Sequence, residues 1–138
     1  MNMASRRSMA GLTLIEVLVV SVIVAILAAI AVPAYQQQVR EGRRVEARGM
    51  LVEVMNREHR WFADNSAYTT DVVGDLDFDP AESENGYYTV IAAGTEQQVV
   101  LTADVTSKGG QDEDTACTTL TLSTTGAKTP IGDRDKCW

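Results

Sequence analysis

A long apolar segment near the start of the chain is the strongest pattern in its 138 residues. Glu16 stands at its edge, and no basic residue lies between Leu12 and Gln38. A helix over residues 12–35 would be about 36 Å long at about 1.5 Å per residue, against roughly 30 Å for the hydrocarbon core of a bilayer. The segment therefore predicts a helix that can span a membrane.

The helical pattern continues beyond the apolar segment, to about Asn65. Pro33 removes one backbone hydrogen bond inside the apolar part, which predicts a kink or a local opening there. Farther on, apolar side chains recur at three- and four-residue spacing and predict a stripe for a packed domain to cover; they are Ala47, Met50, Leu51, Val54, Trp61 and Phe62. Glu58 falls within this stripe, and pairing with a nearby arginine is the only role we assign to it.

The pattern changes to loops and strands after Asn65. Residues 66–86 are polar and acid-rich and contain Gly74 and Pro80, which predicts a connecting loop with at most a short helical turn. Three segments rich in β-branched residues follow, at 87–93, 98–105 and 118–123. Residues 94–96 separate the first two at hairpin distance. We expect an antiparallel meander packed on the helix stripe, and thus an α+β fold.

Charge is distributed unevenly along the chain. Residues 36–63 carry six basic and four acidic side chains, whereas residues 64–138 carry four basic and fourteen acidic ones. Binding to nucleic acid depends on clustered lysine and arginine that neutralise phosphates. The acidic second half therefore makes a nucleic-acid partner unlikely.

The residues before the apolar segment indicate its orientation. Arg6 and Arg7 favour a cytoplasmic N-terminus, with the remainder of the chain on the other side of the membrane. Disulfides persist in such exported domains, and the two cysteines, Cys117 and Cys137, predict one bridge. Closing a loop of about twenty residues stabilises a fold by roughly 3 kcal/mol in the chain-entropy model.

The residues at the start of the apolar segment carry a specific motif. The run Gly11-Leu12-Thr13-Leu14-Ile15-Glu16, placed directly before the apolar helix, resembles the type IV prepilin signal. The resemblance implies that a membrane prepilin peptidase cuts between Gly11 and Leu12 and that the new amine of Leu12 is N-methylated. Leu12 departs from the phenylalanine that most family members have there. Three segments result: a leader (residues 1–11), an apolar transmembrane and assembly helix (12–35) and a soluble head that includes the outer half of the long helix (36–138).

Glu16 is the one charged group in the apolar helix. A carboxylate within lipid costs about 2.5 to 3.5 kcal/mol on insertion scales, so such a residue usually has a partner. The nearest candidate is the new amine of Leu12, in the same chain or in a neighbouring copy. In pilins the corresponding glutamate is held to pair with the amine of an adjacent subunit and to fix its axial register. The alternative is a glutamate at the headgroup level of a simple signal anchor.

The whole plan is similar to the type IVa pilin fold, a long helix packed on an antiparallel sheet with a disulfide-closed C-terminal loop. The segment that begins at Cys117 and ends at Cys137 and Trp138 looks like that of PilE-type minor pilins. By this resemblance Pro33 marks a region that can unwind in the filament. It implies an inner-membrane prepilin with a periplasmic head that later joins an extracellular fibre, for twitching motility, adhesion or related functions.

The implied partners are other pilin subunits, the prepilin peptidase, the inner-membrane assembly machinery and, before assembly, lipid. Four alternatives stay open: a major pilin, a type II secretion pseudopilin, a DNA-uptake pilin and a membrane-anchored interaction module unrelated to pili. An enzyme is improbable because the single histidine, His59, is expected on a helix surface without a nucleophile and base beside it.

No cofactor is expected, and no metal ligands are assigned. Asp75, Asp77 and Asp79 have a spacing suited to calcium, but Pro80 and Gly86 occupy positions where an EF-hand needs glycine and glutamate. A looser calcium site there, or at residues 112–114, stays open beside the simpler interpretation of solvated acidic loops.

Overall fold

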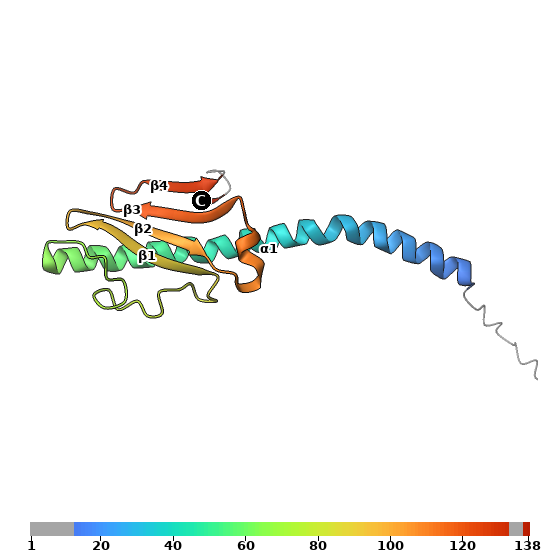
Figure 1. Cartoon of the computed structure of the whole chain (residues 1–138), viewed down its shortest axis with the longest axis horizontal. Coiled ribbons are helices and arrows are strands. Elements are labelled where there is room, and N and C mark those ends of the chain that lie inside the picture. The colour runs from blue at the N-terminus through green and yellow to red at the C-terminus, as the bar shows by residue number, and fades with distance from the viewer. Residues whose placement is uncertain (1–12, 133–136) are drawn as a thin grey trace, which may run out of the picture. The chain divides into compact units, whose positions relative to one another are not determined.

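The structure is a computed structural model that describes residues 13–132 and 137–138. It has the expected α+β architecture, a long helix followed by a small antiparallel sheet (Figure 1). The elements in order are α1 (Leu14–Asn65), β1 (Tyr88–Thr95), β2 (Gln98–Val105), the 3-10 helix η1 (Lys108–Glu113), β3 (Cys117–Ser123) and β4 (Lys128–Gly132).

Helix α1 belongs to two compact units. The first ends at Gln37 and the second begins at Gln38. Pro33 lies inside α1 without ending it. The helix ends at the expected residue because Ser66 adopts a left-handed conformation, with φ of 57°, while its N–H donates to the carbonyl of Phe62 at 2.7 Å.

The sheet is a meander of four antiparallel strands in the order β1-β2-β3-β4. The three predicted strands are confirmed, with β1 extended to Thr95, so that the connection to β2 is only two residues long. Close approach at this hairpin requires Gly94, because a Cβ there would lie 2.2 Å from the carbonyl oxygen of Gln98. Strand β4 was not predicted; it pairs with β3 from Leu122↔Lys128 to Cys117↔Gly132.

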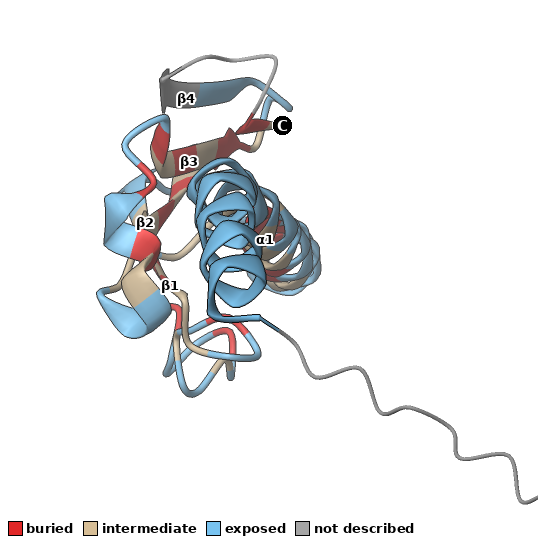
Figure 2. Cartoon of the chain, turned by 90° about the vertical axis from the view of Figure 1, so that its right-hand side faces the viewer, coloured by how far each residue is buried: buried red, intermediate tan, exposed pale blue. Residues whose placement is uncertain are grey.

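One face of the sheet packs on the outer half of α1, and the buried residues of both line this contact (Figure 2). Four of the six predicted stripe residues are buried: Ala47, Met50, Leu51 and Val54. Trp61 packs against the core while partly exposed. The prediction for Phe62 is wrong, since 37% of it is exposed and its ring stacks on that of Tyr68 with the ring centres 4.5 Å apart.

The connection between α1 and β1 is a loop, as predicted. Among its described residues there is no helix, and Val72 and Leu76 enter the hydrophobic core. Arg57 of α1 holds the loop, because its Nη1 donates to the carbonyl oxygens of Leu76 and Asp77 at 3.0 and 2.5 Å. The loop is thus a packed part of the head.

Candidate functional site

The first 22 residues of α1 form an apolar surface that no other described part of the chain covers. Every residue of this segment, residues 14–35, is exposed; the exposed fraction is 84% for Leu14 at its start and 72% for Tyr35 at its end. Its most apolar window has a mean hydropathy of 3.0, and α1 is the one helix in the described residues that is long and apolar enough to cross a membrane. So much apolar surface must be covered by lipid or by other helices.

Glu16 lies in the first turn of this apolar surface, where Thr13 caps the helix. The N–H of Glu16 donates to Oγ1 of Thr13 at 3.3 Å, and the N–H groups of Glu16 and Val17 also reach the Thr13 carbonyl oxygen at 3.1 and 3.2 Å. A threonine followed three residues later by glutamate is the spacing of a capping box, a signal that our sequence analysis missed. In the described part of the chain Glu16 makes no ion pair, and its side chain is exposed.

The other predicted site residues fall in different places. Gly11 and Leu12, the expected cleavage site, lie outside the described residues. Pro33 lies near the C-terminal end of the apolar surface, and the roles assigned to it and to Glu16 stay predictions.

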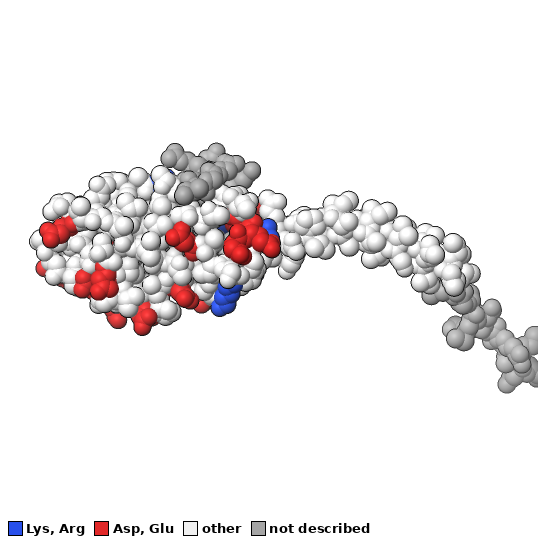
Figure 3. All heavy atoms as spheres, in the orientation of Figure 1, with Lys and Arg blue, Asp and Glu red and all other residues white. Residues whose placement is uncertain are grey.

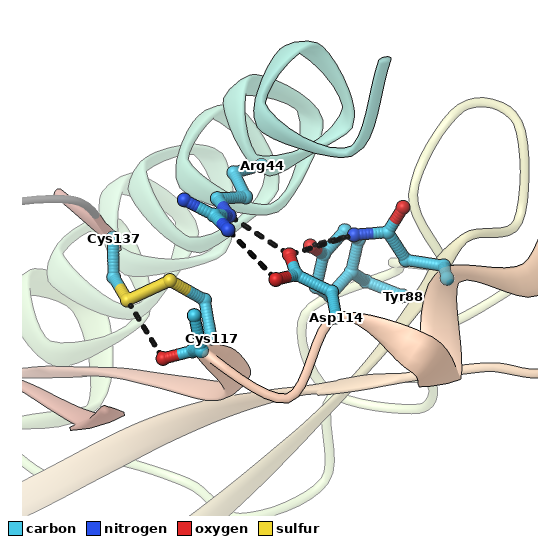
Figure 4. The surroundings of a disulfide bond; sticks show 7 residues. Arg44, Tyr88, Asp114, Cys117 and Cys137 are labelled. Atoms are coloured by element: carbon cyan, nitrogen blue, oxygen red, sulfur yellow. Dashed lines mark hydrogen bonds and ion pairs between the residues drawn. A yellow bond between two sulfur atoms is a disulfide. The ribbon is translucent and has the colours of Figure 1, made fainter. Parts of the chain in front are cut away.

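The disulfide between Cys117 and Cys137 is formed, as predicted (Figure 4). The two Cα atoms are 5.6 Å apart, and both residues are fully buried in the core of the head. Cys117 begins β3, and its N–H donates to the carbonyl oxygen of Asp114 at 3.0 Å. The bridge therefore joins the end of the chain to the segment that follows η1.

A buried polar network that the sequence did not reveal lies beside the disulfide (Figure 4). Arg44 of α1 donates to both carboxylate oxygens of Asp114, from Nε at 2.8 Å and from Nη2 at 2.7 Å. Both side chains are at most 5% exposed. The hydrogen bond to Asp114 raises the pKa of Arg44, while burial opposes the rise. Arg44 and Asp114 satisfy each other through two parallel charge-assisted hydrogen bonds.

Gln111 extends this network to the sheet. Its Nε2 donates to the hydroxyl oxygen of Tyr88 at 2.9 Å and to Oδ2 of Asp114 at 3.2 Å. Burial raises the pKa of Tyr88 to about 12. Helix α1, strand β1 and the η1 segment thus meet in one set of polar contacts, and no pattern along the chain could have shown that residues 44 and 114 are paired.

Glu58 is fully buried in the helix stripe, and the predicted pairing with an arginine is wrong. Its Oε2 accepts a hydrogen bond from the N–H of Thr69 at 3.3 Å, and Oε1 has no hydrogen-bond partner in the structure. Burial raises the pKa of this carboxyl, and the charge of Asp75 raises it further, against the effect of the Thr69 N–H. The group is therefore a buried acid that is partly satisfied by the loop.

The described acidic loop residues do not converge on a metal-ion site. Among residues 13–132 and 137–138 no group of three or more potential ligands could hold a metal ion. Asp114 pairs with Arg44, Glu113 with Arg40, and Asp75 accepts a hydrogen bond from Oγ1 of Thr69 at 2.5 Å. His59 lies exposed on α1, with Nδ1 at 3.4 Å from the hydroxyl of Tyr68.

Known families account for this combination of helix and head. A family described as "Type IV minor pilin ComP, DNA uptake sequence receptor" matches residues 33–121, and a "Prokaryotic N-terminal methylation motif" matches residues 6–32. The chain belongs to this family of type IV pilins. The family is one of structural fibre proteins and not of enzymes.

Individual relatives agree with this assignment. The pilin is 37% identical over 110 residues to the fimbrial protein EcpC of Eikenella corrodens. The aligned region covers 72% of this chain and 64% of EcpC. The chain thus spans less than two thirds of the length of this curated relative. The fold also matches a type IV pilin from Shewanella oneidensis, with a TM-score of 0.50 and 24% identity over 72% of this chain and 97% of that one.

Proposed function

We propose that this pilin is a minor subunit of a type IV pilus. It is made as a membrane prepilin, cut by prepilin peptidase between Gly11 and Leu12, N-methylated at Leu12 and assembled into the fibre. The methylation motif over residues 6–32 supports the processing, and the match to a family of minor pilins supports the minor role.

The exposed apolar surface of residues 14–35 is the observation that carries this proposal. The head has a hydrophobic core of its own, to which residues 14–35 contribute no buried side chain. Lipid covers the apolar surface before assembly, and the equivalent helices of other pilin subunits replace lipid in the fibre. Because exchange of lipid for apolar helices brings little hydrophobic gain, specific polar and packing contacts must drive assembly.

The location and partners follow from the same segment. Arg6 and Arg7 favour a cytoplasmic N-terminus in the inner membrane and a periplasmic head, which becomes extracellular when the fibre grows. Other pilins, the peptidase and the assembly machinery are then the partners. Twitching motility or adhesion is the function we expect of the fibre, and the fimbrial name of EcpC supports a place in a surface fibre.

Glu16 provides the specific polar contact in this proposal. It binds the methylated amine of Leu12 in a neighbouring subunit, and the exposed carboxylate, without an ion pair in the described chain, supports this role. We expect Glu16→Ala to leave membrane insertion intact and to reduce the amount of pilin in sheared fibres by about tenfold or more. The Leu12 amine of the neighbouring subunit would lose its partner in this variant. Immunoblots of membrane and fibre fractions measure both quantities.

Glu16→Gln is the matched control for shape, because it keeps the size of the side chain and removes only the charge. We expect it to be as defective as the alanine variant. Wild-type amounts of either variant in fibres would refute the role of Glu16. Mass spectrometry of the native N-terminus tests the wider proposal, which fails if the protein keeps residues 1–11.

A second candidate function is reception of DNA, which the description of the family favours. The charge of the head argues against it, because residues 64–138 have fourteen acidic and four basic side chains, and acidic groups are conspicuous on the face drawn in Figure 3. We therefore expect the detergent-solubilised pilin to cause no gel shift of duplex DNA at moderate salt. A shift that depends on DNA sequence would establish the second function instead.

A further inference from the structure

The head contains a groove of about 660 Å³ whose walls are α1 and the loop that follows it. We call it the acidic groove. Its lining comes from helix residues Val45, Glu46, Gly49, Met50, Glu53 and Arg57 and from loop residues 77–80 and 82–84. It lies on the head, apart from the Cys117–Cys137 bridge and from the polar network around Arg44.

The acidic groove has a strong excess of negative charge. Six carboxylates and one arginine line it; the carboxylates are Glu46, Glu53, Asp77, Asp79, Glu82 and Glu84. Glu53 pairs with Arg57, and Glu46 accepts hydrogen bonds from the backbone N–H and the Nδ2 of Asn85 at 3.2 and 2.8 Å. Among the described residues the loop carboxylates make no ion pair. Like charges gathered in a groove raise its attraction for a cation.

Arg57 of α1 is the basic residue in the groove lining, and its contacts show how the lining holds a guanidinium. Arg57 donates to two loop carbonyl oxygens and, from Nη2, to Oε1 of Glu53 at 2.8 Å. Its guanidinium carbon lies 5.2 Å from the centre of the Phe78 ring. Carbonyl oxygens, a carboxylate and an aromatic face together make a receptor for a basic side chain. Arg57 pairs with only one of the six carboxylates, and the other five make no ion pair among the described residues. The groove can therefore attract another cation.

The rest of the lining is suited to the aliphatic stem of such a side chain. Val45 is 57% exposed, and Phe78 and Met50 contribute apolar atoms beside the carboxylates. Lysine and arginine combine an aliphatic stem with a charged end. A phosphate backbone would be repelled by the same carboxylates, so nucleic acid does not fit this groove.

We propose that the acidic groove binds an arginine or lysine side chain of a neighbouring pilin subunit in the fibre. This rests on the proposed function, which brings the heads of subunits together. It adds a contact between heads to the one that Glu16 makes between helices. Charge complementarity selects which subunit can be the neighbour, because a head without a basic side chain at that position leaves the carboxylates unpaired.

Matched charge variants of the full-length pilin test the proposal in cells that make the fibre. The groove variant carries Asp77→Asn, Asp79→Asn and Glu84→Gln; Arg57 keeps its contact there because it binds the backbone of residue 77 and not the side chain. The control variant removes three exposed acids outside the groove, Asp64→Asn, Glu96→Gln and Asp112→Asn, so that both have the same net charge. We expect the groove variant to fall about fivefold or more in sheared fibres relative to the membrane fraction and the control to stay near wild type. Equal incorporation of both variants would overturn the proposal.

Site-specific photocrosslinking identifies the occupant and does not depend on these variants. A photoreactive phenylalanine analogue replaces Phe78 in the groove, or exposed Val73 in the same loop as the control. The expected product is a crosslink from position 78, and not from 73, to a pilin peptide with a basic residue at or next to the site. A crosslink to a non-pilin protein, or none at position 78 in assembled fibres, contradicts the proposal.

Different results would contradict the groove contact and the proposed function. If the wild-type pilin is trimmed and present in fibres while the groove variant enters equally well, only the groove contact is wrong. If the wild type keeps its leader and is absent from fibres, the proposed function fails and the groove contact fails with it.

Discussion

Glu58 is a buried acid in an environment that disfavours its charged form. It is fully buried between α1 and the loop, with one carboxylate oxygen bonded to the Thr69 N–H and the other without a partner. Burying an acid in this way disfavours its charged form and raises its pKa. The position follows from the helical repeat, which places residue 58 on the core face together with Met50, Leu51 and Val54.

The pH dependence of stability tests this description of Glu58. A folded-state pKa above the unfolded one means that the folded protein holds the proton more tightly, so the free energy of unfolding falls as the pH rises from the unfolded pKa through the folded one. Glu58→Gln removes this fall, and we expect it to be more stable than wild type at pH 7 and nearly equal at pH 4. Urea unfolding of the detergent-solubilised pilin at both pH values is the measurement.

Glu96→Gln, at the exposed turn between β1 and β2, controls for the loss of one negative charge. The interpretation is wrong if Glu58→Gln destabilises the protein at pH 7 more than at pH 4.

At the scale of elements, the Arg44–Asp114 pair fixes the η1 segment to α1. Both charges are buried, so removal of one leaves the other without compensation, at a cost of about 3 to 5 kcal/mol. We expect Arg44→Met to lose about that much free energy of unfolding, and the double variant Arg44→Met with Asp114→Leu to lose clearly less, since an apolar pair leaves no charge behind. Chemical denaturation of the three proteins measures the difference. If the double variant is the least stable, the two charges are not coupled as described.

Features that depend on neighbouring residues in the sequence could be predicted, whereas contacts between distant residues could not. The end of α1 and three strands were predicted because helical spacing and β-branched segments are local signals. Strand β4 was missed because it is short and contains Pro130, which the edge of a sheet tolerates. Phe62 was misplaced because helical spacing does not show where the sheet stops covering the helix. The Arg44–Asp114 contact joins residues 70 apart and has no local signal.

For the whole molecule, the head depends on the disulfide more than a larger domain would. The bridge closes a separation of 20 residues next to the core, and a small domain gains most from such a link. We expect replacement of Cys117 and Cys137 by alanine to lower the free energy of unfolding by about 3 kcal/mol while membrane insertion, which depends on residues 14–35, is unchanged. Denaturation with and without reductant measures the loss, and reductant should have no effect on the double-alanine variant. An unchanged unfolding midpoint in that variant would show that the bridge is dispensable.

The cap at Thr13 has a consequence for proteolytic maturation. Among the described residues, the hydrogen bonds that start α1 are made within residues 13–17, so a cut before Leu12 would leave these bonds in place. The proposed cleavage would then exchange a neutral peptide group for an ammonium ion two residues ahead of the helix. A cation at that end opposes the helix dipole, and a carboxylate from another molecule relieves the conflict. Removal of the leader would therefore favour assembly by adding a positive charge that needs a carboxylate partner, without changing the described hydrogen bonds that begin α1.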